Sequence, residues 1–188
     1  MSVFARLEEE FDVNWTTMLV GWNGLGKYSP WPNRKDDFLP LYATDDLAAF
    51  ANKRFASSIA IEEALILKLL PLDLCNERRE TIRGLLMDLA TLNGGDPKLE
   101  LRKWRLVLLE DLLKNLPADA VNGLVALTEF WQCFGYPVES PHEVQGSGNE
   151  ISPSEYYQDR NLKRLLARHW AWLQEERTAI MNRSDKGN

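Results

Sequence analysis

The residue pattern closest to a chemical motif is a glycine-rich stretch from Gly21 to Tyr28, which reads GWNGLGKY. Gly21, Gly26 and Lys27 have the spacing of a phosphate-binding P-loop, in which backbone amides and the lysine hold nucleotide phosphates. That motif requires serine or threonine after the lysine and a strand before the loop, but Tyr28 follows Lys27 and the preceding apolar residues have helical spacing. The stretch is better explained as a turn after a helix. A small-ligand pocket or an enzyme site near Gly21–Tyr28 stays as an alternative.

The histidines and cysteines form no recognisable catalytic or metal-binding pattern. His142 lies in a polar loop, and His169 lies on the apolar stripe of the last expected helix, where a core histidine is usual. Cys75 and Cys133 each lie in an apolar helical segment, which predicts two buried thiols rather than a disulfide or a reactive thiolate. We therefore expect no catalytic residue, no metal site, no cofactor and no enzymatic activity.

Acidic side chains in two loops predict a surface that binds a protein. Asp36 and Asp37 share a long loop with Trp31, which stands between two prolines, and Glu139 and Glu143 lie in a second loop. Aromatic anchors next to charged groups are typical of protein interfaces rather than of metal sites. The alternative for Trp31 is a plug that pins its own loop, because large aromatic side chains are mostly buried.

Composition narrows the class of partner. The net charge is −6 and the isoelectric point is near 5.1, which argues against general nucleic-acid binding because that needs a basic face. The first residues, MSVFARLEEEF, contain no apolar core of a signal peptide. The longest apolar run, 64–74, is interrupted by charged residues and a proline, so we expect no membrane association and a cytoplasmic location.

The spacing of apolar residues predicts one all-α domain over residues 1–188, built as a bundle of about six to eight mostly antiparallel helices. A pair of helices between Asp96 and Pro137 is expected at its centre, with Asp96 as the first cap and Gly135 at the far end. The expected inward faces of this pair are Leu101, Trp104, Val107, Leu108 and Leu112, then Val121, Leu124, Val125, Thr128 and Trp131.

The remaining helices follow from caps and breakers. Asn14, Thr44 and the Ser152–Glu155 capping box are expected to begin helices, and Pro71 is expected to end one. The expected ranges are 2–11, 15–22, 44–55, 58–70, 74–92 and about 152–182 with a break near 159–161, and long loops are expected near 23–41 and 138–151. The expected inward faces include Ile61, Leu65 and Leu69, then Leu162, Leu165, Leu166, His169, Trp170, Leu173 and Ile180.

Two pairs of stretches resemble a bacterial family of uncharacterised helical proteins. They are WTTMLVGW at 15–22 with LPLYA at 39–43, and Lys103-Trp104 with the following leucines and FGYP at 134–137. The family has no established catalytic residues that the resemblance could transfer. Small acidic helical proteins of this kind are similar to immunity proteins, the antidotes of bacterial toxin systems. The resemblance thus implies an immunity protein that binds and occludes a toxin, and the acidic loops predict that this partner is basic. A structural subunit that forms a homodimer or larger homo-oligomer through surplus apolar helix surface is a further alternative.

Overall fold

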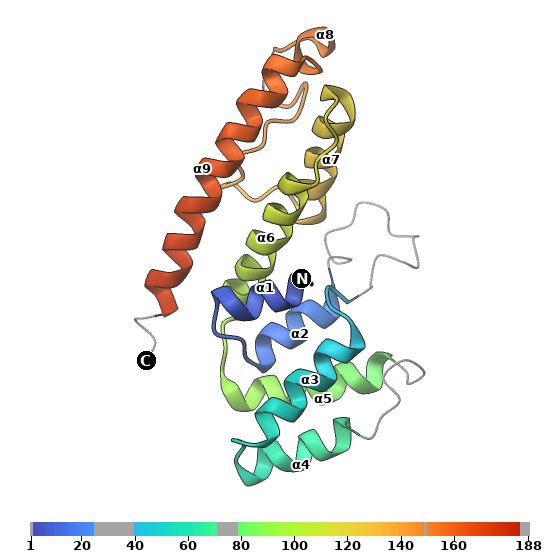
Figure 1. The fold of residues 1–188 in the computed structure, drawn as a ribbon, viewed down its shortest axis with the longest axis vertical. Helices are drawn as coiled ribbons and strands as arrows, with labels where there is room; N and C mark the ends of the chain where they lie inside the picture. Colours follow the sequence, from blue (N-terminus) through green and yellow to red (C-terminus); the bar gives the residue numbers. More distant parts are fainter. Residues whose placement is uncertain (1, 25–39, 71–78, 149, 185–188) are drawn as a thin grey trace. The chain divides into compact units, whose positions relative to one another are not determined.

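The computed structural model describes residues 2–24, 40–70, 79–148 and 150–184 of the chain (Figure 1). Within these ranges it contains nine helices and no strand, which confirms the predicted all-α fold. All helices but α8 have eight or more residues. Their bounds are α1 Val3–Glu10, α2 Trp15–Asn23, α3 Thr44–Phe55, α4 Ala60–Leu69, α5 Arg79–Asn93, α6 Pro97–Lys114, α7 Ala120–Cys133, α8 Pro153–Tyr156 and α9 Asp159–Ser184.

The described residues group into two compact units. Unit 1 holds those up to Trp104, with α1 to α5 and the first part of α6, and unit 2 holds those from Arg105 onward. The expectation of one domain over residues 1–188 stays a prediction.

Local signals determine where several helices begin. The Asn14 side chain accepts a hydrogen bond from the Thr17 amide at 3.0 Å, and the Thr17 hydroxyl accepts one from the Asn14 amide at 3.0 Å. This reciprocal capping box satisfies two amides that a helix end leaves unpaired. At the start of α8 the amide and the hydroxyl of Ser152 both donate to Glu155 Oε2, at 3.2 and 2.7 Å. The helix breaks after Tyr156 and resumes at Asp159, just before the expected range 159–161.

The core of unit 1 is an aromatic cluster around Trp104. The Trp104 ring stacks on Tyr42 and Phe4, with ring centroids 5.9 and 6.3 Å away. Its indole N–H donates to the Thr17 carbonyl at 2.9 Å, and the Tyr42 hydroxyl donates to the Met18 carbonyl at 2.9 Å. Each buried polar tip therefore has a partner on α2, which fixes how α2 lies on the start of α6.

A buried ion pair also ties α6 to the turn before α2. Lys103 Nζ lies 2.9 Å from Glu100 Oε1 and donates to the Asp12 carbonyl at 2.9 Å. The Thr17 hydroxyl donates to Glu100 Oε2 at 2.5 Å. Because both charges are almost fully buried, this network has a structural role: losing one partner would leave a buried charge poorly compensated.

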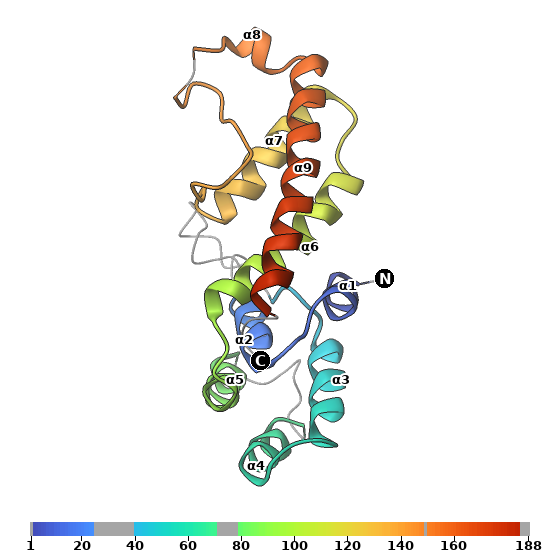
Figure 2. The same ribbon diagram turned by 90° about the vertical axis from the view of Figure 1, so that its left-hand side faces the viewer.

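Unit 2 is built on the packing of α9 against α7 and the second part of α6 (Figure 2). Trp131 of α7 is fully buried, and its indole N–H donates to His169 Nε2 of α9 at 2.8 Å. Trp172 packs edge-on against the Trp131 ring at a centroid distance of 5.3 Å. His169 is buried, as the sequence predicts.

The predicted inward face of α9 is largely correct, whereas that of α4 is correct only at Leu69 and that of α7 only at Leu124 and Trp131. Val121 and Val125 are 52% and 37% exposed, and Leu127 is buried instead. A Cβ added to Gly123 would lie 3.2 Å from the Leu162 side chain, so α7 packs through its glycine side rather than through its valines.

On α4 a charged residue is buried in place of an aliphatic one. Glu62 accepts a hydrogen bond from the Trp15 indole at 2.6 Å and pairs with Arg54 at 3.1 Å, and Ile61 is left 63% exposed. Smaller corrections concern side chains expected in the core. Trp170 is 36% exposed, Cys133, Leu65, Leu101, Leu108, Leu112, Thr128 and Leu166 are half-buried, and Leu106, Leu109 and Leu113 are buried instead.

Candidate functional site

The predicted protein-binding residues fall in two places. Trp31, Asp36 and Asp37 lie outside the described residues, so their predicted role stays a prediction. Glu139 and Glu143 lie in the connection between α7 and α8, in unit 2. This acidic connection, residues 134–152, is the part of the predicted surface whose geometry the structure gives.

The end of α7 determines where the acidic connection begins. Gly135 has a φ of 70° and Tyr136 a φ of 47°, and both of their amides donate back to carbonyls in the last turn of α7. This is the helix end predicted from Gly135. A left-handed tyrosine is unfavourable, and the hydrogen bond from its hydroxyl to the Thr128 carbonyl at 3.1 Å helps to hold it.

Glu139 is the exposed end of a buried charge network. Arg105 of α6 donates to Glu139 Oε1 at 3.0 Å and to Glu176 Oε1 of α9 at 3.2 Å. Its guanidinium carbon lies 5.8 Å from the Trp131 ring centroid and 5.3 Å from that of Trp172. The Arg105 side chain is 6% exposed and the Glu139 side chain 53%, so a buried cation holds a carboxylate at the surface.

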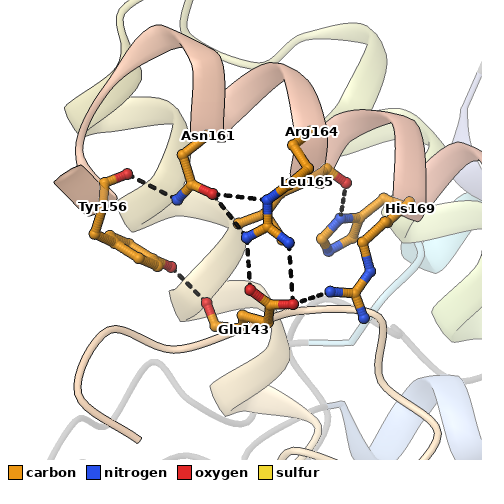
Figure 3. A network of polar contacts seen from close by, with 7 residues as sticks. Glu143, Tyr156, Asn161, Arg164, Leu165 and His169 are labelled. Carbon is orange, nitrogen blue, oxygen red and sulfur yellow. Dashed lines mark hydrogen bonds and ion pairs between the residues drawn. The ribbon is translucent and has the colours of Figure 1, made fainter. Parts of the chain in front are cut away.

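Two arginines of α9 hold the carboxylate of Glu143 (Figure 3). Arg164 donates to both of its carboxylate oxygens, at 3.1 and 2.5 Å, and Arg168 forms a further ion pair with it. The hydrogen bonds from Arg164 lower the pKa of Glu143, and the charges of Arg164 and Arg168 lower it further, so the group is ionised at neutral pH.

The same arginine connects this pair to the start of α9. Asn161 accepts hydrogen bonds from Arg164 Nε at 3.1 Å and Nη2 at 2.7 Å, and its own amide donates to the Tyr156 carbonyl at 2.8 Å. The Tyr156 hydroxyl donates to the Glu143 carbonyl at 2.6 Å, which closes the ring of contacts drawn in Figure 3. The loop is thus clamped through both its backbone and its carboxylate.

The imidazoles of His142 and His169 lie next to these contacts, with ring centroids 5.6 Å apart. His169 accepts from the Trp131 indole at Nε2, so its proton lies on Nδ1, 2.6 Å from the Leu165 carbonyl. His142 Nε2 lies 2.9 Å from the hydroxyl of Thr128, and its Nδ1 is buried with no hydrogen-bond partner. Burial lowers both pKa values to about 4, and the neighbouring His169 adds to the effect on His142.

This chemistry fits a rigid anchor for an acidic loop better than it fits catalysis. The carboxylates are paired with arginines, and both imidazoles are neutral near pH 7. Within the described ranges no group of three or more His, Cys, Asp or Glu side chains is placed to hold a metal ion. A surface pocket of about 590 Å³ adjoins the clamp, and its lining includes Glu143, Glu155, Arg160 and Arg164, so it carries both signs of charge.

The glycine-rich stretch has a packing explanation at its first residue. Helix α2 runs up to Asn23, where a P-loop would have a strand, and Gly21 lies within it. A Cβ at Gly21 would lie 2.6 Å from the Trp104 ring and 2.7 Å from Tyr42, so glycine is required for the aromatic cluster. Lys27 and Tyr28 lie outside the described residues, and a ligand pocket near Gly21–Tyr28 stays a prediction.

Sequence reasoning missed the basic partners of the loop. Arg105 and Glu139 are separated by 34 positions and Glu143 and Arg164 by 21, so no local pattern connects them. The available signal was the spacing of Arg164 and Arg168, which places two cations one turn apart on α9.

Comparison with known proteins identifies a family without an assigned activity. A family model described as "Uncharacterized protein conserved in bacteria (DUF2247)" matches residues 5–177, which is most of the chain. Neither the search of curated proteins nor that of solved structures returned a match. None of the described helices combines the length and the hydrophobicity that a bilayer span requires.

Proposed function

This chain belongs to the DUF2247 family of uncharacterised bacterial proteins, and we propose that it is a protein-binding antidote, an immunity protein that binds and occludes a bacterial toxin. The observation that carries the proposal is the clamped acidic connection in unit 2. Glu139 and Glu143 are charged and partly exposed, and arginines of α6 and α9 pair with them. The partner it suits is a protein with a basic face.

A clamped loop favours tight binding because ordering a flexible loop costs free energy during association. Here the ordering takes place when unit 2 folds, since Arg105 and Arg164 already hold the two carboxylates. Glu139 is the more accessible of the two, with 53% of its side chain exposed against 31% for Glu143. We therefore assign Glu139 the direct contact with the partner and Glu143 the positioning of the loop.

The overall charge supports the same class of partner. A net charge of −6 attracts a basic protein from a distance and speeds encounter at low ionic strength. A toxin that acts on nucleic acid needs a basic face, and an acidic antidote that covers this face would block access to the substrate. Trp31, Asp36 and Asp37 remain part of the proposal as a second acidic loop.

The test is capture of the partner followed by kinetics. The tagged full chain is incubated with lysate of its source cells and washed at low and high salt, and the retained protein is purified and assayed for inhibition. We expect one basic partner, released by salt, whose activity the chain blocks at equal molar ratio. Glu139→Gln should slow association about threefold, and Glu63→Gln at an exposed position of α4 is the control with the same charge change. No partner at either salt, or a partner that stays active, would overturn the proposal.

A second candidate, a homodimer, is favoured by one observation in unit 1. Ile59, just before α4, and Ile61 and Leu67 on α4 are 64%, 63% and 52% exposed. Such apolar side chains on a monomer suit a contact with a second copy. Light scattering would give a dimer mass that Ile61→Ser reduces to the monomer. A monomer mass for the unaltered chain over the whole concentration range would contradict this candidate.

A further inference from the structure

The charges of unit 2 are distributed unevenly along the sequence. Between Lys114 and Arg160 there is no lysine and no arginine, and the same 45 positions carry seven carboxylates: Asp119, Glu129, Glu139, Glu143, Glu150, Glu155 and Asp159. This segment includes all of α7. A basic protein that docks on α7 therefore meets carboxylates from this segment and no lysine or arginine from it.

The outer face of α7 carries apolar side chains in the middle of this acidic segment. Val121 and Val125 are one turn apart and exposed, and Glu129 continues the same line one turn later. Glu129 is exposed and makes no hydrogen bond or ion pair with any described residue. The opposite side of α7 packs on α9 through Leu124 and Trp131, so the outer face is not needed for the fold.

We propose that this outer face of α7, formed by Val121, Val125 and Glu129, docks an amphipathic helix of the partner whose apolar side is flanked by lysine or arginine. The inference rests on the proposed function and names the surface that carries it. The valines supply apolar contact, and the Glu129 carboxylate at the end of the line selects a cation. Asp119, which caps the start of α7 through Asn122, adds negative charge near the other end of the helix. An acidic partner would be repelled at both ends.

Charge distinguishes this face from the exposed apolar side chains of α4. The exposed side of α4 carries Ile61 and Leu67, but Glu63 and Lys68 are both exposed beside them. Charges of both signs give no preference for a basic partner. The α4 face therefore serves as the matched control for the α7 face.

The experiment uses the full chain labelled with ¹⁵N and a defined probe, a synthetic helical peptide made of leucine and lysine. A second peptide with glutamate in place of lysine is the charge control. We expect the lysine peptide to shift the amide resonances of α7 and the glutamate peptide to shift none. Val121→Ala with Val125→Ala should raise the dissociation constant about tenfold, because each change removes two methyl groups from the contact. Ile61→Ala with Leu67→Ala on α4 should leave it within twofold.

The inference is overturned if the shifts map to α4 or elsewhere, or if the α7 double variant binds like the unaltered chain. Circular dichroism verifies that the variants keep their helices, which is expected because the substituted side chains are exposed. Failure of this inference can be told apart from failure of the proposed function. A captured toxin that binds the α7 variant unchanged removes the surface and leaves the antidote, whereas peptide binding on α7 without any toxin inhibition leaves the surface and removes the antidote.

Discussion

Lowering the pH from 7 to 5 should destabilise unit 2 through its two buried imidazoles. His142 and His169 have pKa values of about 4 in the folded protein, against about 6.5 for an unfolded histidine. Between these values the unfolded chain binds more protons than the folded one. The stability that comes from the two neutral imidazoles is therefore fully present above pH 6.5 and is lost as the pH falls toward 4. Hydrogen bonds from Arg164 lower the pKa of Glu143, so its stabilising contribution is lost only as the pH falls below the ordinary pKa of a glutamate, outside the interval from pH 7 to pH 5.

The size of the effect follows from the two pKa values. At pH 5 an unfolded histidine is mostly protonated, whereas His142 and His169 in the folded protein are mostly neutral. Each histidine therefore lowers the free energy of unfolding by about 2 kcal/mol relative to pH 7, and the pair by about 4 kcal/mol. Burial is the main reason that His169 resists the proton, and protonation at Nε2 would also break the hydrogen bond from the Trp131 indole. A loss of this size is a large part of the stability of an ordinary domain.

Amide hydrogen exchange of α9 measures this loss in unit 2 alone. We expect protection of α9 to fall by about 4 kcal/mol between pH 7 and pH 5, after correction for the intrinsic exchange rate. His169→Gln keeps an acceptor for the indole but does not titrate, so about half of the pH dependence should disappear. Equal pH dependence in the variant and the unaltered chain, or constant protection between pH 7 and pH 5, would refute the reasoning.

Three further predictions concern packing, charge and association. Gly21→Ala should cost about 2 kcal/mol in urea unfolding because its Cβ would overlap a buried indole ring, whereas Gly84→Ala, where a Cβ meets nothing within 4 Å, should stabilise by up to about 1 kcal/mol. Arg105→Met should cost about 3 kcal/mol in the same assay because it removes the cation held by two carboxylates. Charge reversal at Asp36 and Asp37 should slow association with the partner and weaken its salt dependence in surface plasmon resonance, and unchanged kinetics would remove both residues from the interface.

The parts of the fold that could be predicted are those controlled by neighbouring residues. Asn14 with Thr17, Ser152 with Glu155, and Gly135 act within one helical turn, and each begins or ends a helix where the sequence indicates. Such signals need no knowledge of tertiary contacts. This is why the helix ranges were predicted more accurately than the helix faces.

The helix faces depended on distant partners. Val121 and Val125 are as apolar as Leu127, so periodicity alone could not show that α7 packs through Gly123 and Leu127. Glu62 is buried where the Trp15 indole, 47 positions earlier, donates to it and Arg54 pairs with it.

The candidate site, too, could be predicted only where its residues are close in the sequence. Its loops and their carboxylates could be read from the sequence, but the cations that hold Glu139 and Glu143 come from α6 and α9. The contact between His142 and His169 joins a loop to a helix 27 positions later and gives no signal in either segment.

The most direct measurement of the central claim is growth of cells that express the captured partner, with and without this chain. The account predicts that the partner alone arrests growth and that co-expression of the chain restores it. It further predicts that combined charge reversal at Glu139 and Glu129 weakens the rescue, while reversal at Glu63 does not. Continued arrest in the presence of the chain, with a complex confirmed in the same cells, would contradict the account.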